Sequence, residues 1–239
     1  GEASHVEPFG IRVTTLGIAP AVIRVETAHT GGSIAIEIFD GETMVAKARG
    51  DSAEITIPDA KLWSAETPHL YRCHVTLTEN GALADEADQL FGIRTLHYDT
   101  TGFYVNGQRT MLRGGCLHHD NGIIGACSIP EAEERRLRIL KRAGFNAIRC
   151  AHNPASSDLL DACDKLGVYV MDEMWDMWYV RKTKFDYAID FPTCWCEDVK
   201  AVVDRDYSHP SVILYSIGNE VTEPHEEKGV QLGKDIIEL

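Results

Sequence analysis

Polar side chains that could perform acid/base chemistry follow four apolar runs in the C-terminal part of the sequence. Carboxyl groups donate and accept protons in reactions, and histidine, arginine and asparagine bind polar substrates through hydrogen bonds. Groups of this kind after successive apolar runs indicate a shared polar site. The four groups are His118, His119 and Asp120; Arg149, His152 and Asn153; Asp172 and Glu173; and Asn219 and Glu220.

The apolar runs before these groups have the length of buried β-strands and alternate with helical patterns. Strand and helix in alternation predict a parallel sheet built from βαβ units. Parallel strands present their carboxyl ends at one edge, where a (β/α)8 barrel places its active site. An open doubly wound sheet also binds ligands there, but no GxGxxG fingerprint follows the first strand, so the barrel is preferred. We expect strands within 110–120, 145–154, 168–173 and 212–217, and helices at 131–143, 156–166 and 194–209.

Local signals support these elements. Asn106 and Gly107 separate two β-rich runs and are typical of a type I′ hairpin turn. Ser128 followed three residues later by Glu131 has the spacing of a capping box at the start of the first helix. Gly144 is expected to end that helix.

The N-terminal part has a different pattern, in which short alternating runs recur about every ten residues without helical windows. Such runs predict an antiparallel, immunoglobulin-like β-sandwich. The expected fold is therefore multi-domain, β plus α/β, with a sandwich at 1–95 and a barrel domain at 96–239. Two runs place apolar residues on one face: Ile34, Ile36 and Ile38, and Cys73, Val75 and Leu77.

The second region is too short for a whole barrel, which needs about 250 residues. We expect a truncated (β/α)8 TIM barrel comprising strands 1–4, the N-terminal half. An open parallel sheet leaves an edge unpaired, and this edge predicts aggregation or homo-oligomer formation.

Composition excludes several classes of function. The net charge of −14 argues against binding to nucleic acid through phosphates. No apolar run is long enough to span a membrane, and the first residues do not resemble a signal peptide. The seven cysteines are scattered without paired CxxC spacing, so we expect reduced, buried thiols and a cytoplasmic protein.

Four motifs, in this order and spacing, resemble glycoside hydrolase family 2, most closely its β-galactosidase branch. They are "FGIRTLHYDTTGFYVNGQRTMLRGGCLHHD", "GFNAIRCAHNP", "LLDACDKLGVYVMDE" and "HPSVILYSIGNE". Upstream, "LWSAETPHLYRCHVTL" is similar to the end of the sandwich domain that precedes the barrel in this family. The resemblance implies a retaining β-glycosidase with a carbohydrate substrate and no cofactor.

The resemblance also implies residue roles. Glu220 matches the acid/base, and Asn219 matches a residue that hydrogen-bonds the sugar beside the cleaved bond. Arg149 matches an arginine that orients the nucleophile. His152 and His118 match histidines that contact the sugar, although Ala151 replaces the usual serine before His152. Further substrate-binding candidates are Asn153 beside His152, Asp120 at an often acidic position, Glu173 and Trp175.

Several alternatives stay open at this point. Glu173 either supports the site or, less in keeping with its position, serves as a second carboxylate. Trp175, Trp178 and Tyr179 either stack on sugars or pack as a lid. No metal site is expected, because Met177 and Tyr179 occupy the positions where some relatives bind Mg²⁺, and the adjacent His118 and His119 point to opposite faces of a strand.

The family's nucleophile follows the seventh strand, so the resemblance implies that residues 1–239 lack it and that this fragment alone is inactive. β-Glucuronidase and β-mannosidase are alternative activities. For the chain by itself, a non-catalytic carbohydrate-binding or interaction module is the alternative from another class.

Overall fold

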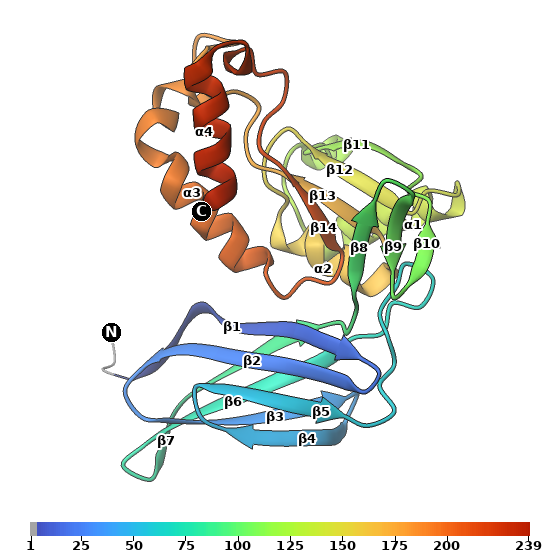
Figure 1. Ribbon diagram of the computed structural model, residues 1–239, viewed down its shortest axis with the longest axis vertical. Coiled ribbons are helices and arrows are strands. Elements are labelled where there is room, and N and C mark those ends of the chain that lie inside the picture. The colour runs from blue at the N-terminus through green and yellow to red at the C-terminus, as the bar shows by residue number, and fades with distance from the viewer. Residues whose placement is uncertain (1–3) are drawn as a thin grey trace. The chain divides into compact units, whose positions relative to one another are not determined.

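The computed structural model describes residues 4–239, which form two compact units (Figure 1). One unit contains the described residues up to Met111 together with Tyr207–Pro210, and the other contains Leu112–Asp206 and Ser211–Leu239. In the described part of the chain, no helix has both the length and the hydropathy needed to cross a bilayer.

The first unit contains an antiparallel β-sandwich of two sheets. One sheet has the order β1-β2-β5, with β1 at His5–Ile18, β2 at Ala21–Thr30 and β5 at Ser52–Ile57. The other has the order β4-β3-β6-β7, with β3 at Ser33–Asp40, β4 at Thr43–Arg49, β6 at Tyr71–Glu79 and β7 at Ala82–Phe91. Alternate residues of the central strands point inward, which confirms the period-two pattern of the sequence.

The core of the sandwich is built from cross-strand pairs. Ile36 on β3 lies opposite Val75 on β6, and Ile34 lies opposite Leu77. All of these side chains are buried, together with Ile23 and Val25 of the facing sheet. The two predicted apolar faces are therefore part of one core, as the hydrophobic effect requires.

A smaller sheet of three short strands follows in the order β10-β9-β8. Asn106 and Gly107 connect β9 to β10 and both have positive φ, at 51° and 76°, which confirms the predicted type I′ turn. The Asn106 side chain also accepts a hydrogen bond from Thr95 N and donates one to Trp63 O. The strands span Leu96–Asp99 (β8), Gly102–Val105 (β9) and Gln108–Thr110 (β10).

The second unit contains a parallel sheet in the order β11-β12-β13-β14, flanked by helices (Figure 1). The strands span Gly114–His118, Ala147–Ala151, Tyr169–Glu173 and Val212–Ser216. The helices are α1 (Pro130–Arg142), α2 (Ser157–Leu166), α3 (Phe191–Asp206) and α4 (Glu227–Glu238). Short 3-10 turns lie at Gly122–Ile124 (η1), Tyr187–Ile189 (η2) and Glu223–His225 (η3). Four parallel strands are half the number of a complete barrel.

Two local predictions were wrong. The N-cap of α1 is Ile129, and no side chain caps it; the Ser128 hydroxyl instead donates to Glu133 at 3.0 Å. The third helix begins three residues before the predicted Cys194 and ends at Asp206, because Pro192 is tolerated in a first helical turn. Gly144 ends α1 with φ of 91°, as predicted.

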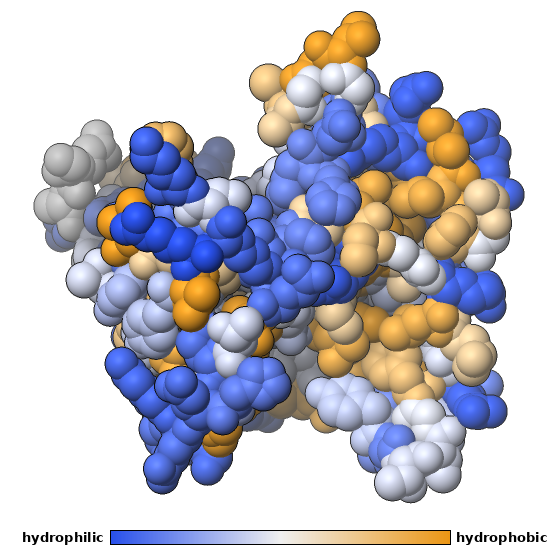
Figure 2. Space-filling view, turned by 90° about the horizontal axis from the view of Figure 1, so that it is seen from above, coloured by the Kyte–Doolittle hydropathy of each residue, from blue (hydrophilic) through white to orange (hydrophobic). Residues whose placement is uncertain are grey.

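Two apolar clusters hold this unit together. Leu137 of α1 and Leu160 and Cys163 of α2 pack against Val170 and other residues of the sheet. Phe191 at the start of α3 packs with Leu232 and other residues of α4 and with tryptophans of the loop after β13. Figure 2 shows that part of the viewed face is apolar, so burial of apolar side chains is incomplete there.

Candidate active site

Glu173 lies at the centre of the polar groups that end the parallel strands. Its side chain is 0% exposed and contacts residues of two neighbouring strand ends. Arg149 Nε donates to Oε2 at 2.9 Å, Ser216 Oγ donates to Oε2 at 2.6 Å, and His152 Nδ1 lies 2.7 Å from Oε1. A carboxylate out of contact with water needs such partners, because an unpaired buried charge is costly. Glu173 therefore organises the site.

Arg149 joins the second strand to the fourth. Besides Glu173, its guanidinium donates to Asn219 Oδ1 at 3.1 Å. Burial lowers the pKa of Arg149, but the hydrogen bond and the charge of Glu173 outweigh it and hold the pKa above its ordinary value. Arg149 is thus a fixed cation that orients Asn219, the residue before Glu220.

A second ion pair holds Asn219 from the other side. Asn219 Nδ2 donates to Asp176 Oδ1 at 2.8 Å, and Lys182 Nζ donates to the same oxygen at 2.7 Å. Lys182 also donates to the carbonyl oxygen of Asn219 at 2.7 Å. Desolvation raises the pKa of Asp176, but the hydrogen bonds from Lys182 and Asn219 bring it below its ordinary value. Asp176 is therefore an ionised anchor for the segment after β14.

The backbone after β14 is held just as closely. Met174 N donates to Ser216 O at 2.9 Å and Asn219 N donates to Trp175 O at 3.1 Å, which prolongs the pairing of β13 and β14 beyond their ends. At Gly218, a Cβ would lie 3.0 Å from Trp178 Nε1 and 2.9 Å from a Val221 methyl group. Glycine at this position therefore allows the turn to pass the indole ring.

Glu220 follows this turn in an unusual backbone conformation. Its φ is 48°, in the left-handed region that non-glycine residues rarely adopt. Its side chain is 83% exposed, and Oε2 lies 3.8 Å from Lys182 Nζ. Such a conformation costs roughly 1 kcal/mol, and outliers of this kind concentrate at functional sites.

The histidines of the first two strands meet at the same edge. The rings of His118 and His152 lie edge to face with centroids 5.2 Å apart. His119 turns away and its Nε2 lies 3.3 Å from Asn153 O, as expected for adjacent strand residues. Asp120 accepts a hydrogen bond from Gly122 N at 2.8 Å, so this oxygen stabilises the loop after β11.

The tryptophans of the loop after β13 are buried, which bears on whether they stack on a sugar or pack as a lid. Trp175 is only 4% exposed, and its Nε1 donates to Asp198 at 3.2 Å. Trp178 is also buried, stacks on Phe191 and donates to Ile217 O at 2.7 Å. Both indoles belong to the apolar cluster with α3 and α4. Their burial favours a packed role over stacking on a sugar.

Three residues that bind Glu173 or Asn219 were not predicted from the sequence. Ser216 was assigned only as a strand residue, and Asp176 and Lys182 lie in a loop where charged residues are usually solvated. Of the three, only Ser216 could have been predicted as a site residue. It is the last residue of β14, two positions after Leu214, and the carboxyl ends of parallel strands are where a barrel places its site.

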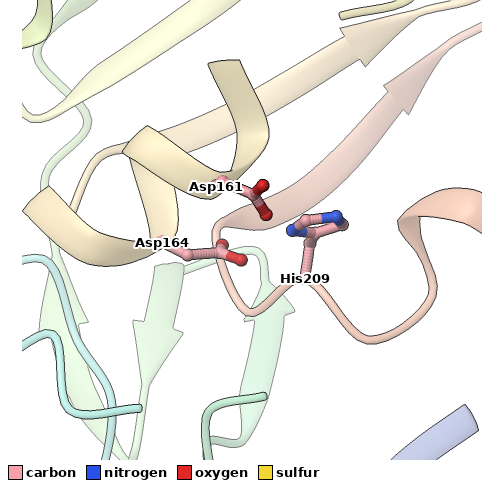
Figure 3. Close-up of side chains that lie close together, drawn as sticks. All are labelled: Asp161, Asp164 and His209. Carbon is pink, nitrogen blue, oxygen red and sulfur yellow. The ribbon is translucent and has the colours of Figure 1, made fainter. Parts of the chain in front are cut away.

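The carboxylates of α2 lie elsewhere in this unit. Asp161 and Asp164 are three residues apart on the same helix face (Figure 3). Asp164 accepts a hydrogen bond from Ser211 N at 3.0 Å, just before β14 begins. They are therefore near the amino ends of the strands, opposite the edge that carries Glu173.

The cysteines are all free thiols, but they are not uniformly buried as expected. Cys73, Cys150 and Cys163 are buried, whereas Cys116 and Cys127 are exposed. Cys116 lies beside the site, where its Sγ accepts a hydrogen bond from Arg149 at 3.6 Å.

Two family models match nearly the whole chain. Residues 9–94 match the model described as "Glycosyl hydrolases family 2", and residues 97–236 match "Glycosyl hydrolases family 2, TIM barrel domain". The first covers the sandwich and the second covers the half-barrel with the polar site. The chain belongs to glycosyl hydrolase family 2.

Comparison with individual proteins gives the same family. The chain is 41% identical to the β-galactosidase BoGH2A of Bacteroides ovatus over 194 residues, which cover 81% of this chain and 23% of that protein. A family 2 member from Bacteroides cellulosilyticus has a similar structure, with a TM-score of 0.91 and 35% identity, over 98% of this chain and 33% of that one. An FMN-binding β-glucuronidase from Facaelibacterium prausnitzii matches with a TM-score of 0.84 and 28% identity, over 98% and 40%. The chain thus spans less than half the length of these relatives.

Proposed function

We propose that this chain carries the acid/base part of a retaining β-glycosidase site and that the natural substrate is a β-galactoside. The observation that supports this proposal most directly is the fixed position of Asn219, the residue before Glu220. Arg149 holds the Asn219 side chain from one side, and the Asp176–Lys182 pair holds it from the other. A catalytic carboxyl needs such a rigid attachment, because misplacement by about 1 Å can reduce a rate 100-fold.

In the proposed mechanism, Glu220 donates its proton to the glycosidic oxygen while a second carboxylate attacks the anomeric carbon. The leaving sugar or aglycone then departs, and Glu220 removes a proton from the water that releases the covalent intermediate. Asn219, His152 and His118 are proposed to bind sugar hydroxyl groups. The strained backbone of Glu220 supports this role.

Glu173 is proposed as a support for the site, because its oxygens already accept hydrogen bonds from Arg149 and Ser216 and contact His152. A nucleophile needs an oxygen free to attack. We therefore propose that the nucleophile is a carboxylate outside residues 1–239.

The charges at the site support a neutral sugar over a uronic acid. The cations that bind the residues at the strand ends are paired with carboxylates: Arg136 with Glu133, Arg149 with Glu173 and Lys182 with Asp176. A uronate would need a cation that is not already compensated. In a polypeptide that continues this chain through an eight-stranded barrel, a higher kcat/KM on nitrophenyl β-galactoside than on the β-glucuronide would agree with this proposal, and the reverse order would refute it.

The acid/base assignment is testable in a polypeptide that continues this chain through an eight-stranded barrel. Glu220→Gln should lower kcat for a galactoside with a poor leaving group roughly 100-fold or more, as expected for loss of general acid/base catalysis. Glu227→Gln is a matched control, since Glu227 is an exposed glutamate nearby at the start of α4. Equal turnover by the two variants would contradict the assignment.

For residues 1–239 alone, we propose sugar binding without hydrolysis. Calorimetric titration with galactose should detect weak binding that Arg149→Ala abolishes, and no product should form from nitrophenyl β-galactoside. Turnover by the isolated chain would contradict the proposal that the second carboxylate lies outside it.

A further inference from the structure

A buried cluster of two carboxyl groups and one guanidinium lies behind the candidate site. Asp172 is the last residue but one of β13, and Arg205 and Asp206 end α3. Arg205 Nη2 donates to Asp172 Oδ2 at 2.9 Å, and Arg205 Nε donates to Asp206 Oδ1 at 2.6 Å. Asp172 and Asp206 are each only 1% exposed, so this cluster is removed from water.

The cluster fixes the loop that carries two of the candidate sugar-binding residues. Ala155 N donates to Asp172 Oδ1 at 2.8 Å, and Arg205 Nη1 donates to Ala155 O at 2.6 Å. Both backbone polar groups of Ala155 are therefore held, three residues after His152 and two after Asn153. Asp172 Oδ1 also accepts from Glu173 N at 3.1 Å, which links the cluster directly to the central glutamate.

The charges in the cluster do not balance if both carboxyls are ionised. Among the described residues, Arg205 is the single cation that contacts them, and Asp206 Oδ2 is buried without a hydrogen-bond partner. Two buried thiols also face these carboxyls, Cys150 on β12 and Cys163 on α2. Burial, together with nearby carboxylates, raises the pKa of each thiol well above its ordinary value, so both stay neutral. A proton on Asp206 would reduce the charge and donate to Asp172.

The electrostatic surroundings of Asp206 support the same arrangement. Burial raises its pKa, Arg205 lowers it and Asp172 raises it again, to about 7 in total. Two close carboxyls that share one proton behave in this way, because both cannot ionise cheaply in a desolvated site.

We propose that Asp172, Arg205 and Asp206 form a positioning cluster for the loop of His152 and Asn153, and that Asp172 and Asp206 share one proton when the loop is held. The loop's relevance to sugar binding rests on the proposed function. The shared proton does not, because it is inferred from the burial of both carboxyls around Arg205 and from the unpartnered Asp206 Oδ2. Raising the pH above neutrality removes the proton and loosens the attachment of Ala155.

The sign of the pH effect follows from linkage. Unfolded aspartate loses its proton near pH 4, whereas folded Asp206 keeps it up to about pH 7. The folded state therefore binds an extra proton between these values, and stability falls as the pH rises through this window. Asp206→Asn mimics the protonated form, so it should remove this component. Glu197→Gln, an exposed carboxyl of the same helix, is the matched control.

The experiment follows the Ala155 amide by NMR between about pH 5 and pH 9 in the 239-residue chain, with urea unfolding measured at both ends of this range and the variants reporting the part that depends on Asp206. We expect the wild-type and Glu197→Gln amides to titrate with a midpoint at about 7 and the Asp206→Asn amide to stay constant. Above neutrality, Asp206→Asn should unfold at an equal or higher urea concentration than wild type.

A wild-type Ala155 amide that does not titrate in this range would overturn the proposal, whether or not the variants fold. Failure of Asp206→Asn to fold under mildly acidic conditions would also contradict it, since the variant reproduces the neutral form. Neither readout involves hydrolysis, so these outcomes are separate from a failure of the glycosidase proposal.

Discussion

Replacing Glu173 by glutamine should destabilise the second unit far more than the same change at Glu220. The glutamine side chain would have nearly the same shape but no charge, and its amide would present hydrogen atoms to neighbours that are themselves donors. Glu173 accepts from Arg149 and Ser216 and contacts His152. Glu220 makes one loose ion pair at 3.8 Å from an exposed side chain.

The magnitude follows from these contacts. A hydrogen bond to a charged group contributes about 1.5 to 3 kcal/mol. The amide oxygen can replace one carboxylate oxygen, so about one such bond is lost and the others weaken. We expect Glu173→Gln to lower the free energy of unfolding by about 2 to 3 kcal/mol, whereas Glu220→Gln should change it by less than about 0.5 kcal/mol.

Urea unfolding followed by tryptophan fluorescence measures this difference in the right part of the chain. Trp175, Trp178 and Trp195 belong to the second unit, and Trp63 alone belongs to the first. The signal therefore reports mainly on the half-barrel. If the two variants had midpoints within experimental error of each other, Glu173 would not be the centre of the network and our description of the site would be wrong.

Four further predictions concern other parts of the molecule. Ile36→Ala, in the middle of the sandwich core, should cost about 2 to 5 kcal/mol in chemical unfolding. Gly107→Ala, at φ of 76° in the hairpin, should cost roughly 1 kcal/mol by the same assay. Glu220→Gly should instead stabilise the chain by up to about 1 kcal/mol by relieving the positive φ, and it should abolish turnover in a polypeptide that completes the barrel. Hydrogen bonds from Thr101 hold the pKa of Asp99 at about 2. The ionised Asp99 side chain therefore stabilises the fold above about pH 4, and this contribution is lost as the pH falls through about 2. A carboxyl NMR titration of Asp99 with a midpoint near 4 would contradict this prediction.

The sheets and the turns were predictable because their sequence patterns are local. Ile34, Ile36 and Ile38 alternate with less buried residues, and only one face of a strand can bury them. Asn106 and Gly107 adopt positive φ, which few other residue types tolerate. These signals do not depend on what the rest of the chain does.

The site network was only partly predictable, because its contacts join distant segments. Ser128 has the spacing of a helix cap, yet Glu133 accepts a hydrogen bond from its hydroxyl and Ser156 Oγ lies 2.7 Å from it. Lys182 has the composition of a solvated loop, yet its ammonium reaches Asp176 and the carbonyl of Asn219. Sequence spacing cannot reveal which of several polar partners a side chain finds in the folded chain.

Whether Trp175 stacks on a sugar or packs in the fold also depends on contacts with distant segments. An aromatic loop after a barrel strand suits a sugar platform and a hydrophobic lid equally. Phe191 and the helices α3 and α4 favour packing, because they bury the indole. Those packing partners come from later segments of the chain, beyond the reach of any local pattern.

The most direct test of the central claim is the response of Glu220→Gln to azide in a polypeptide that completes the barrel. Removing the acid/base should leave a dinitrophenyl β-galactoside able to form the covalent intermediate, since its leaving group needs no proton, while hydrolysis of that intermediate becomes slow. Azide needs no base to attack the intermediate, so we predict that it accelerates turnover and yields a β-galactosyl azide. No acceleration by azide, or a product of inverted configuration, would contradict the assignment of Glu220 as the acid/base of a retaining glycosidase.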